Sequence, residues 1–102
     1  MDNTKRKFNA GQVVMTNSIS RFIDNDIIKI IWIQRSLVRH LNGDWGDCSE
    51  DDIQMNNQAL NNDSRLFSVY NKPNYLTSPI ACIWIITEWD RSVTTILFPE
   101  DY

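Results

Sequence analysis

The chain has 102 residues, of which 42% are hydrophobic and 11% aromatic, and its formal net charge is −3. This length predicts a single domain over residues 1–102, and a charged fraction of 23% argues against disorder over most of it. The negative balance argues against a general nucleic-acid binder, because such a protein needs a basic surface that meets phosphates.

The cysteine count and the apolar runs bear on the compartment. Cys48 and Cys82 are too few for a disulfide framework and favour a reducing, cytoplasmic setting. The polar N-terminus has no apolar segment behind it, so no signal peptide is expected. The longest apolar run, residues 27–33, is interrupted by Lys29 and is too short to cross a bilayer. We therefore expect a cytoplasmic protein without membrane contact.

The N-terminal part predicts a flexible polar tail over residues 1–8, followed by a short strand and two helices. The strand is expected over 12–16, where β-branched residues follow a glycine. A short helix is expected over 18–23. A longer amphipathic helix is expected over 27–41, where apolar residues recur at a spacing of three and four. Gly43 then suits the position after a helix that needs a positive φ.

A third helix is expected over 49–61, with its first turn capped by a side chain. Either Ser49 with Asp52 or Asp47 with Glu50 has the spacing of a capping box. The apolar stripe of this helix is narrow, so we expect it at the surface with one edge buried.

The last third predicts three strands, over 65–70, 80–87 and 93–98. A proline-bearing loop over 71–79 separates the first two. The strand at 80–87 is strongly apolar and should be central, with Trp84 in the core. Short connections favour an antiparallel meander, to which the strand at 12–16 adds at an edge. The fold class predicted is α+β, with two or three helices on a three- to four-stranded antiparallel sheet.

The densest group of chemically versatile residues lies between His40 and Asp47. His40, Asp44 and Asp47 could together bind a divalent cation, and with Glu88 they define one alternative function, a metal-dependent enzyme. The ligands are few, which favours a structural interpretation instead. In that interpretation the aspartates accept hydrogen bonds from backbone amides, His40 sits at a helix end, and the corner is formed by Gly43, Trp45 and Gly46. We expect no cofactor, no bound metal and no catalytic residue.

Charge is distributed unevenly along the chain. Residues 41–64 contain six acids and no lysine or arginine. Acids at a helix N-terminus complement the helix dipole, but an acidic face can also dock on a basic partner. Exposed tryptophans are frequent hot spots at interfaces, although Trp32 and Trp89 could each instead cover a small core. The residues predicted to bind a partner are Asp44, Asp47, Glu50, Asp51, Asp52, Trp32 and Trp89.

Several motifs together resemble a family of small proteins of uncharacterised activity from plasmids, integrative elements and prophages of bacteria. Members often carry the label plasmid-related protein, or that of a type I restriction subunit. The resemblance spans about residues 8–102, and the chain departs from it in the loop 71–79 and at Trp89. The motifs that carry it are Phe8-x2-Gly11-Gln12-Val13-Val14, Arg39-His40-x2-Gly43-Asp44-Trp45-Gly46-Asp47, Arg65-Leu66-x-Ser68-x-Tyr70 and Ile83-Trp84-Ile85-Ile86-Thr87-Glu88-x-Asp90-Arg91-Ser92-x-Thr94-Thr95-Ile96-Leu97.

The resemblance implies a mobile-element setting and no reaction. By analogy of context, it suggests an inhibitor of a host defence system of the anti-CRISPR or anti-restriction type that acts by protein–protein contact. The expected partner is a host protein or nucleoprotein complex with a basic surface, without direct nucleic-acid contact. An edge strand and surface tryptophans also allow a homodimer. A plasmid-maintenance regulator is a further alternative, which the acidic charge balance and the lack of a helix-turn-helix pattern disfavour.

Overall fold

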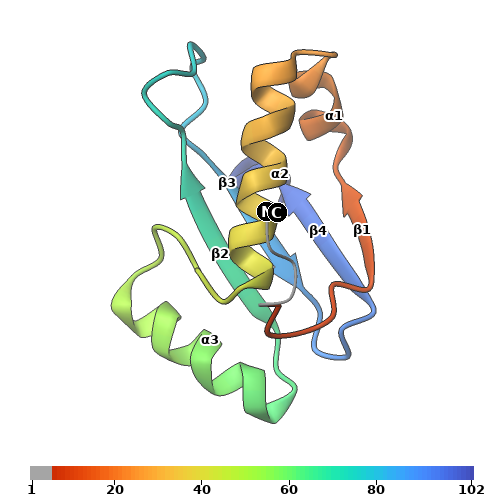
Figure 1. Ribbon diagram of the computed structural model, residues 1–102, viewed down its shortest axis with the longest axis vertical. Coiled ribbons are helices and arrows are strands. Elements are labelled where there is room, and N and C mark those ends of the chain that lie inside the picture. Colours follow the sequence, from red (N-terminus) through yellow and green to blue (C-terminus); the bar gives the residue numbers. More distant parts are fainter. Residues whose placement is uncertain (1–5) are drawn as a thin grey trace.

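The computed structural model describes residues 6–102 of the chain as three helices and one four-stranded sheet, which confirms the predicted α+β class (Figure 1). The elements are, in chain order, β1 (Gln12–Met15), α1 (Asn17–Ile23), α2 (Ile27–Leu41), α3 (Glu50–Asn62), β2 (Leu66–Asn71), β3 (Cys82–Thr87), β4 (Val93–Leu97) and the 3-10 helix η2 (Pro99–Asp101).

The strands are ordered β1-β4-β3-β2, so β1 adds at an edge as predicted. The β2–β3 and β3–β4 pairs are antiparallel, but β1 runs parallel to β4, which makes the sheet mixed instead of purely antiparallel. The two strand ends are held side by side, because Asp101 after β4 accepts hydrogen bonds from the hydroxyls of Thr16 and Ser18 after β1. This pairing joins distant parts of the chain and leaves no local sequence signal.

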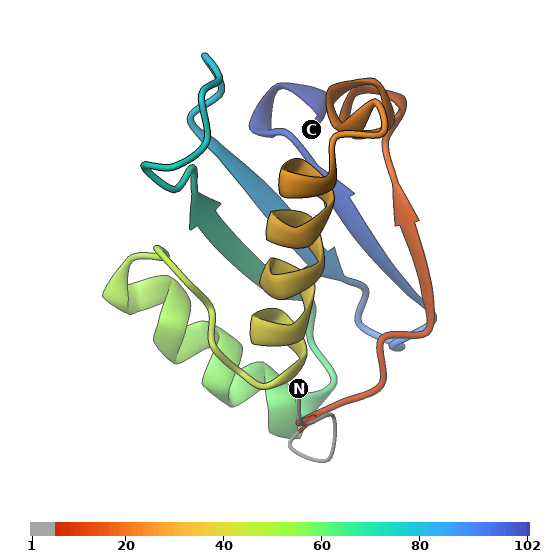
Figure 2. The ribbon, with the colours of Figure 1, turned by 45° about the horizontal axis from the view of Figure 1, so that its top comes forward.

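Helices α1 and α2 lie against one face of the sheet (Figures 1 and 2). Helix α2 begins at Asp26, whose carboxylate accepts from the amides of Ile28 and Lys29. The main core forms between these helices and the sheet-facing side chains of the strands. Its buried members are Ile19, Trp32, Ile33, Tyr70, Leu76, Ile83, Ile85, Ile96 and Phe98.

Helix α3 lies beside the outer edge of β2, at the far side of the sheet from β1 (Figure 1). Its N-cap is Ser49, whose hydroxyl accepts from the amide of Asp52, so Ser49 and not Asp47 caps the first turn. It ends before Asp63, which adopts the left-handed conformation. A second small core at its base contains the buried residues Trp45, Ala59 and Leu66.

The opposite face of the sheet carries the side chains that alternate with the core residues. Phe67 and Trp84 point to this side and are only half-buried, while Ile86 beside them is buried. The expectation that Trp84 lies in the main core is therefore wrong. In β3 both faces are apolar, so hydrophobicity alone does not tell which face the helices cover.

The predicted flexible tail over residues 1–8 does not include Lys7 and Phe8, which contact the rest of the fold. Residues 1–5 lie outside the described residues, but the amide of Lys7 donates to Leu41, and the ring of Phe8 stacks on Trp45.

Within residues 6–102, each helix is too short or too polar to cross a membrane.

Candidate functional site

The segment 40–47 begins where α2 ends, in a Schellman motif. The amide of Gly43 donates to the carbonyl of His40, and the amide of Asp44 donates to that of Arg39. Gly43 has a φ of 79°, as predicted for the position after a helix. These bonds satisfy carbonyls that a helix end would otherwise leave without partners, and they turn the chain toward the edge of β2.

His40 lies fully buried within a chain of hydroxyl groups from three strands. Its Nδ1 contacts the hydroxyl of Ser68 and its Nε2 lies 2.9 Å from that of Thr87. The hydroxyl of Thr87 lies 2.7 Å from that of Thr94, which in turn lies 2.6 Å from the carbonyl of Ala10. The imidazole thus ties α2 to β2, β3 and β4.

The carbonyl of Ala10, at the end of this hydrogen-bond network, determines the direction of every bond in it. The carbonyl of Ala10 only accepts, so Thr94 donates to it. Thr94 then accepts from Thr87, and the Thr87 oxygen accepts from His40. His40 is therefore the tautomer protonated at Nε2, and its Nδ1 accepts from the Ser68 hydroxyl.

Burial lowers the pKa of His40 from 6.5 to about 3, and the positive charge of Arg91 acts in the same direction. The ring is consequently neutral at neutral pH. The rings of Phe8 and Trp45 pack against it in T-shaped contacts. With both nitrogens bonded inside the protein, the imidazole is placed to hold the fold together and not to exchange protons with a substrate.

Each of the two aspartates in this segment accepts hydrogen bonds from neighbouring groups. Asp44 forms a bidentate ion pair with Arg39, at 2.7 and 3.2 Å, and also accepts from the amide of Gly46. The bond with Arg39 holds the pKa of Asp44 below its usual value. Asp47 accepts from the amide of Asn71 at 2.9 Å. Both aspartates thus bind backbone amides, as the structural interpretation predicts.

The same segment closes the outer edge of the sheet. Val69 donates to the carbonyl of Trp45 and accepts from the amide of Asp47. Two residues earlier in β2, the backbone of Phe67 is paired with a side chain. The side-chain amide of Asn56 donates to the carbonyl of Phe67 and accepts from its amide. Edge strands with free backbone groups promote association, and these bonds remove the groups of β2 that would do so.

Gly46 is required at the closest point of this contact. Its φ is 71°, and a Cβ atom there would overlap the carbonyl oxygen of Val69. Trp45 beside it is 3% exposed and its indole donates to Asn57 of α3. This tryptophan therefore fills the corner between α2 and α3.

The side chains of the metal hypothesis are not brought together. His40 is enclosed by hydroxyls, Asp44 is paired with Arg39, and Asp47 bonds the end of β2. Glu88 lies on the β3–β4 connection. Among residues 6–102, no three His, Cys, Asp or Glu side chains are arranged to hold an ion. The geometry therefore gives the metal-dependent alternative no support.

The remaining predicted acids form the first turn of α3, which we call the acidic turn (Glu50, Asp51 and Asp52). Glu50 and Asp51 are exposed and Asp52 is half-buried. In the part of the chain that the structure describes, the ion pair formed is that of Arg39 with Asp44. No lysine or arginine side chain there forms an ion pair with the acidic turn. It complements the dipole of α3 and also presents its charge to solvent.

The two tryptophans predicted to contact a partner differ in their exposure to solvent. Trp32 is 6% exposed and packs edge-on against Phe22, so it belongs to the core and leaves the set of candidate contact residues. Trp89 is 63% exposed on the β3–β4 turn. This turn meets the C-terminal end of α3, where Arg91 donates to the carbonyl of Ala59. A helix of 13 residues is about 20 Å long, so Trp89 lies far from the acidic turn.

Neither cysteine has the environment of a nucleophile. Burial raises the pKa of the Cys48 thiol, and the negative charges of Asp52 and Asp47 add to that shift. Burial likewise raises the pKa of the Cys82 thiol. Both shifts keep the thiols protonated at neutral pH.

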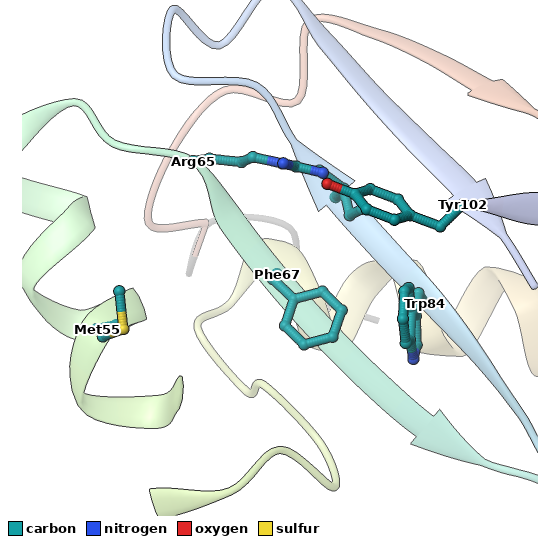
Figure 3. Close-up of a pocket in the computed structure, with 6 residues that line it drawn as sticks. Met55, Arg65, Phe67, Trp84 and Tyr102 are labelled. Atoms are coloured by element: carbon teal, nitrogen blue, oxygen red, sulfur yellow. The ribbon is translucent and has the colours of Figure 1, made fainter. Parts of the chain in front are cut away.

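One feature of the surface was not predicted from the sequence. A pocket of about 370 Å³ opens on the second face of the sheet, beside α3 (Figure 3). We call it the aromatic pocket; its lining residues are Met55, Arg65, Phe67, Trp84, Ile86 and Tyr102. The alternation of β2 gives a usable signal, because Phe67 and Val69 are apolar residues on the face opposite Leu66 and Tyr70.

Scans of the chain against models of protein families, against curated proteins and against solved structures return no match. The resemblance to the mobile-element family therefore stays a prediction that rests on the motifs.

Proposed function

We propose that the chain is a non-enzymatic binding protein of a mobile genetic element, and that it inhibits a host defence complex by protein–protein contact. The observation that carries the binding role is the contrast in how polar groups are used. His40, Asp44 and Asp47 form hydrogen bonds within the fold. Glu50 and Asp51 are exposed, and within the described residues no lysine or arginine side chain forms an ion pair with them.

The charge of the acidic turn suits a basic partner surface. Three consecutive acids sit where the helix is capped, so their positions are fixed by a regular element and not by a loop. Residues 41–64 contain no lysine or arginine that would cancel them. Opposite charges accelerate encounter and fix the orientation of a complex, so a partner with a basic groove is the expected class.

The inhibitory role rests on the motif resemblance. A defence nuclease binds nucleic acid through a basic surface. An acidic protein that occupies such a surface prevents nucleic-acid binding without any chemistry of its own. Restriction enzymes and CRISPR effectors are the defence complexes proposed as targets.

The binding role is tested by capture from a bacterial lysate with two matched double variants. Glu50→Gln with Asp51→Asn removes two acids from the acidic turn. Gln12→Lys with Gln34→Lys alters exposed sites on β1 and α2 and gives the same net charge of −1, since −3 + 2 = −1. We expect the first variant to lose a captured partner that the second retains. Equal capture by both would contradict a contact through the acidic turn.

The inhibitory role is tested separately in living cells. The chain is expressed in a host with a type I restriction system or a CRISPR effector, and the transformation efficiency of a targeted plasmid is measured. The proposal expects a rise of at least tenfold with the native chain and with the Gln12→Lys, Gln34→Lys variant. It expects no rise with the variant of the acidic turn. No rise with any chain, in hosts that hold the captured partner, would contradict inhibition.

A further inference from the structure

The aromatic pocket combines an apolar wall with a single kind of charge. The rings of Phe67 and Trp84 meet edge-on with centroids 5.0 Å apart, and Trp84 meets Tyr102 in the same way at 5.8 Å. The side chains of Met55 and Ile86 complete the wall. Figure 3 shows the phenylalanine and tryptophan side by side below the tyrosine. Such a wall favours a flat apolar group.

The one charged residue that lines the pocket is Arg65. Its guanidinium lies over the ring of Tyr102, 5.1 Å from the centroid, at the rim of the pocket (Figure 3). Within residues 6–102 it forms no ion pair and no hydrogen bond. Its five N–H groups only donate, and their planar arrangement matches the two oxygens of a carboxylate.

We propose that the aromatic pocket binds a small aromatic carboxylate, with the ring against Phe67 and Trp84 and the carboxylate on the guanidinium of Arg65. Its volume of about 370 Å³ lies at the lower end of the range for small-molecule sites, roughly 300–1,000 Å³. The lining residues do not include the acidic turn, so this proposal stands apart from the protein-binding function.

A matched set of probes tests the assignment. 3-Phenylpropionate, 3-phenylpropionamide and 3-phenylpropylammonium share one ring and differ in charge. Binding to the native chain is followed by NMR through the indole N–H of Trp84, one of four tryptophans in the chain. We expect the carboxylate to bind about five- to tenfold more tightly than the amide, since a charge-assisted pair at a partly exposed rim has that order of effect. We expect the ammonium to bind most weakly.

Two variants separate the ring contact from the charge. Arg65→Gln should bring the carboxylate and the amide within about twofold of each other, because the guanidinium is what distinguishes them. Met55→Glu places a negative charge on the pocket wall at a side chain that is 67% exposed, so it should weaken the carboxylate without loss of folding. Gln54→Glu, exposed on the same helix but outside the lining, is the control and should bind as the native chain does.

Three results would overturn the assignment. Tighter binding of the ammonium would mean that the field of the acidic turn, and not Arg65, decides the occupant. An unchanged preference for the carboxylate in Arg65→Gln would remove the proposed pairing. No shift of Trp84 with any probe at millimolar concentration would mean that the pocket holds no small ligand of this kind.

Discussion

The segment 40–47 and the acidic turn are neighbours in the chain, yet their polar side chains have opposite uses. In 40–47, the imidazole and both carboxylates bond to groups inside the protein and close the edge of β2. In the acidic turn, Glu50 and Asp51 point to solvent. The histidine and aspartates concentrated in 40–47 therefore stabilise the fold. The acidic turn beside this segment presents its charge to solvent instead.

The largest expected effect tests the architectural role of Gly46. Gly46→Ala should lower the free energy of unfolding by about 3 kcal/mol or more, because the new methyl group overlaps the Val69 carbonyl and lies 2.7 Å from the ring of Tyr70. Gly43→Ala is the matched control. It has a similar φ, but the atoms nearest to its methyl group would belong to the side chains of Lys7, at 3.2 Å, and Trp45, so about 1 kcal/mol is expected. Urea unfolding measures both, and equal losses would contradict the close contact.

The second effect tests the buried imidazole through pH. The folded pKa of His40 is about 3 and the unfolded value is 6.5, so only the unfolded chain takes up this proton between those values. Stability is therefore full above pH 6.5 and falls as the pH is lowered through that window. We expect the free energy of unfolding to be about 2 kcal/mol smaller at pH 5 than at pH 7.5.

The chain has one histidine, so His40→Gln supplies the control for this pH effect. The variant should be less stable than the native chain at pH 7.5, and its own stability should change little between pH 7.5 and pH 5. A native chain that is equally stable at both values would show that the ring is not buried in its neutral form.

The third effect tests how the edge of β2 is closed. Asn56→Ala removes both side-chain bonds to Phe67 and should cost about 1 to 2 kcal/mol of unfolding free energy, because two partly buried backbone groups lose their partner. Gln58→Ala, exposed on the same helix, should cost less than about 0.5 kcal/mol. Thermal unfolding measures the difference, which would vanish if water replaced the amide without loss.

Much of this architecture could be predicted from the sequence. The periodicity of 27–41 and the glycine after it indicated the helix and its end, and the short connections indicated the antiparallel pairs. The parallel pairing of β1 with β4 could not be predicted, because it depends on contacts between residues about 80 positions apart, such as Thr16 with Asp101.

The candidate site was predicted less completely. The first-turn acids of α3 were anticipated, and of the two alternatives for Trp89 the structure shows the exposed one. Trp32 was misplaced because its helical position borders both the apolar and the polar side of α2, and packing against Phe22 decides between them. The aromatic pocket was missed because it joins α3, β2, β3 and Tyr102 across the tertiary fold.

The smallest expected effect on stability concerns the acidic turn. Glu50→Gln with Asp51→Asn removes two favourable charges from a helix N-terminus and should cost about 1 kcal/mol or less. Circular dichroism during thermal unfolding measures this loss. A cost well above 2 kcal/mol would mean that these acids, like those of 40–47, serve the fold.

The state of the His40 ring tests the central claim most directly, because the architectural role of 40–47 depends on it. Nitrogen-15 NMR of the ring should report one neutral tautomer, protonated at Nε2, that does not titrate between pH 8 and pH 5. A ring that titrates near pH 6.5, or whose signals shift with millimolar Zn²⁺, would contradict the architectural role and make 40–47 a site of chemistry.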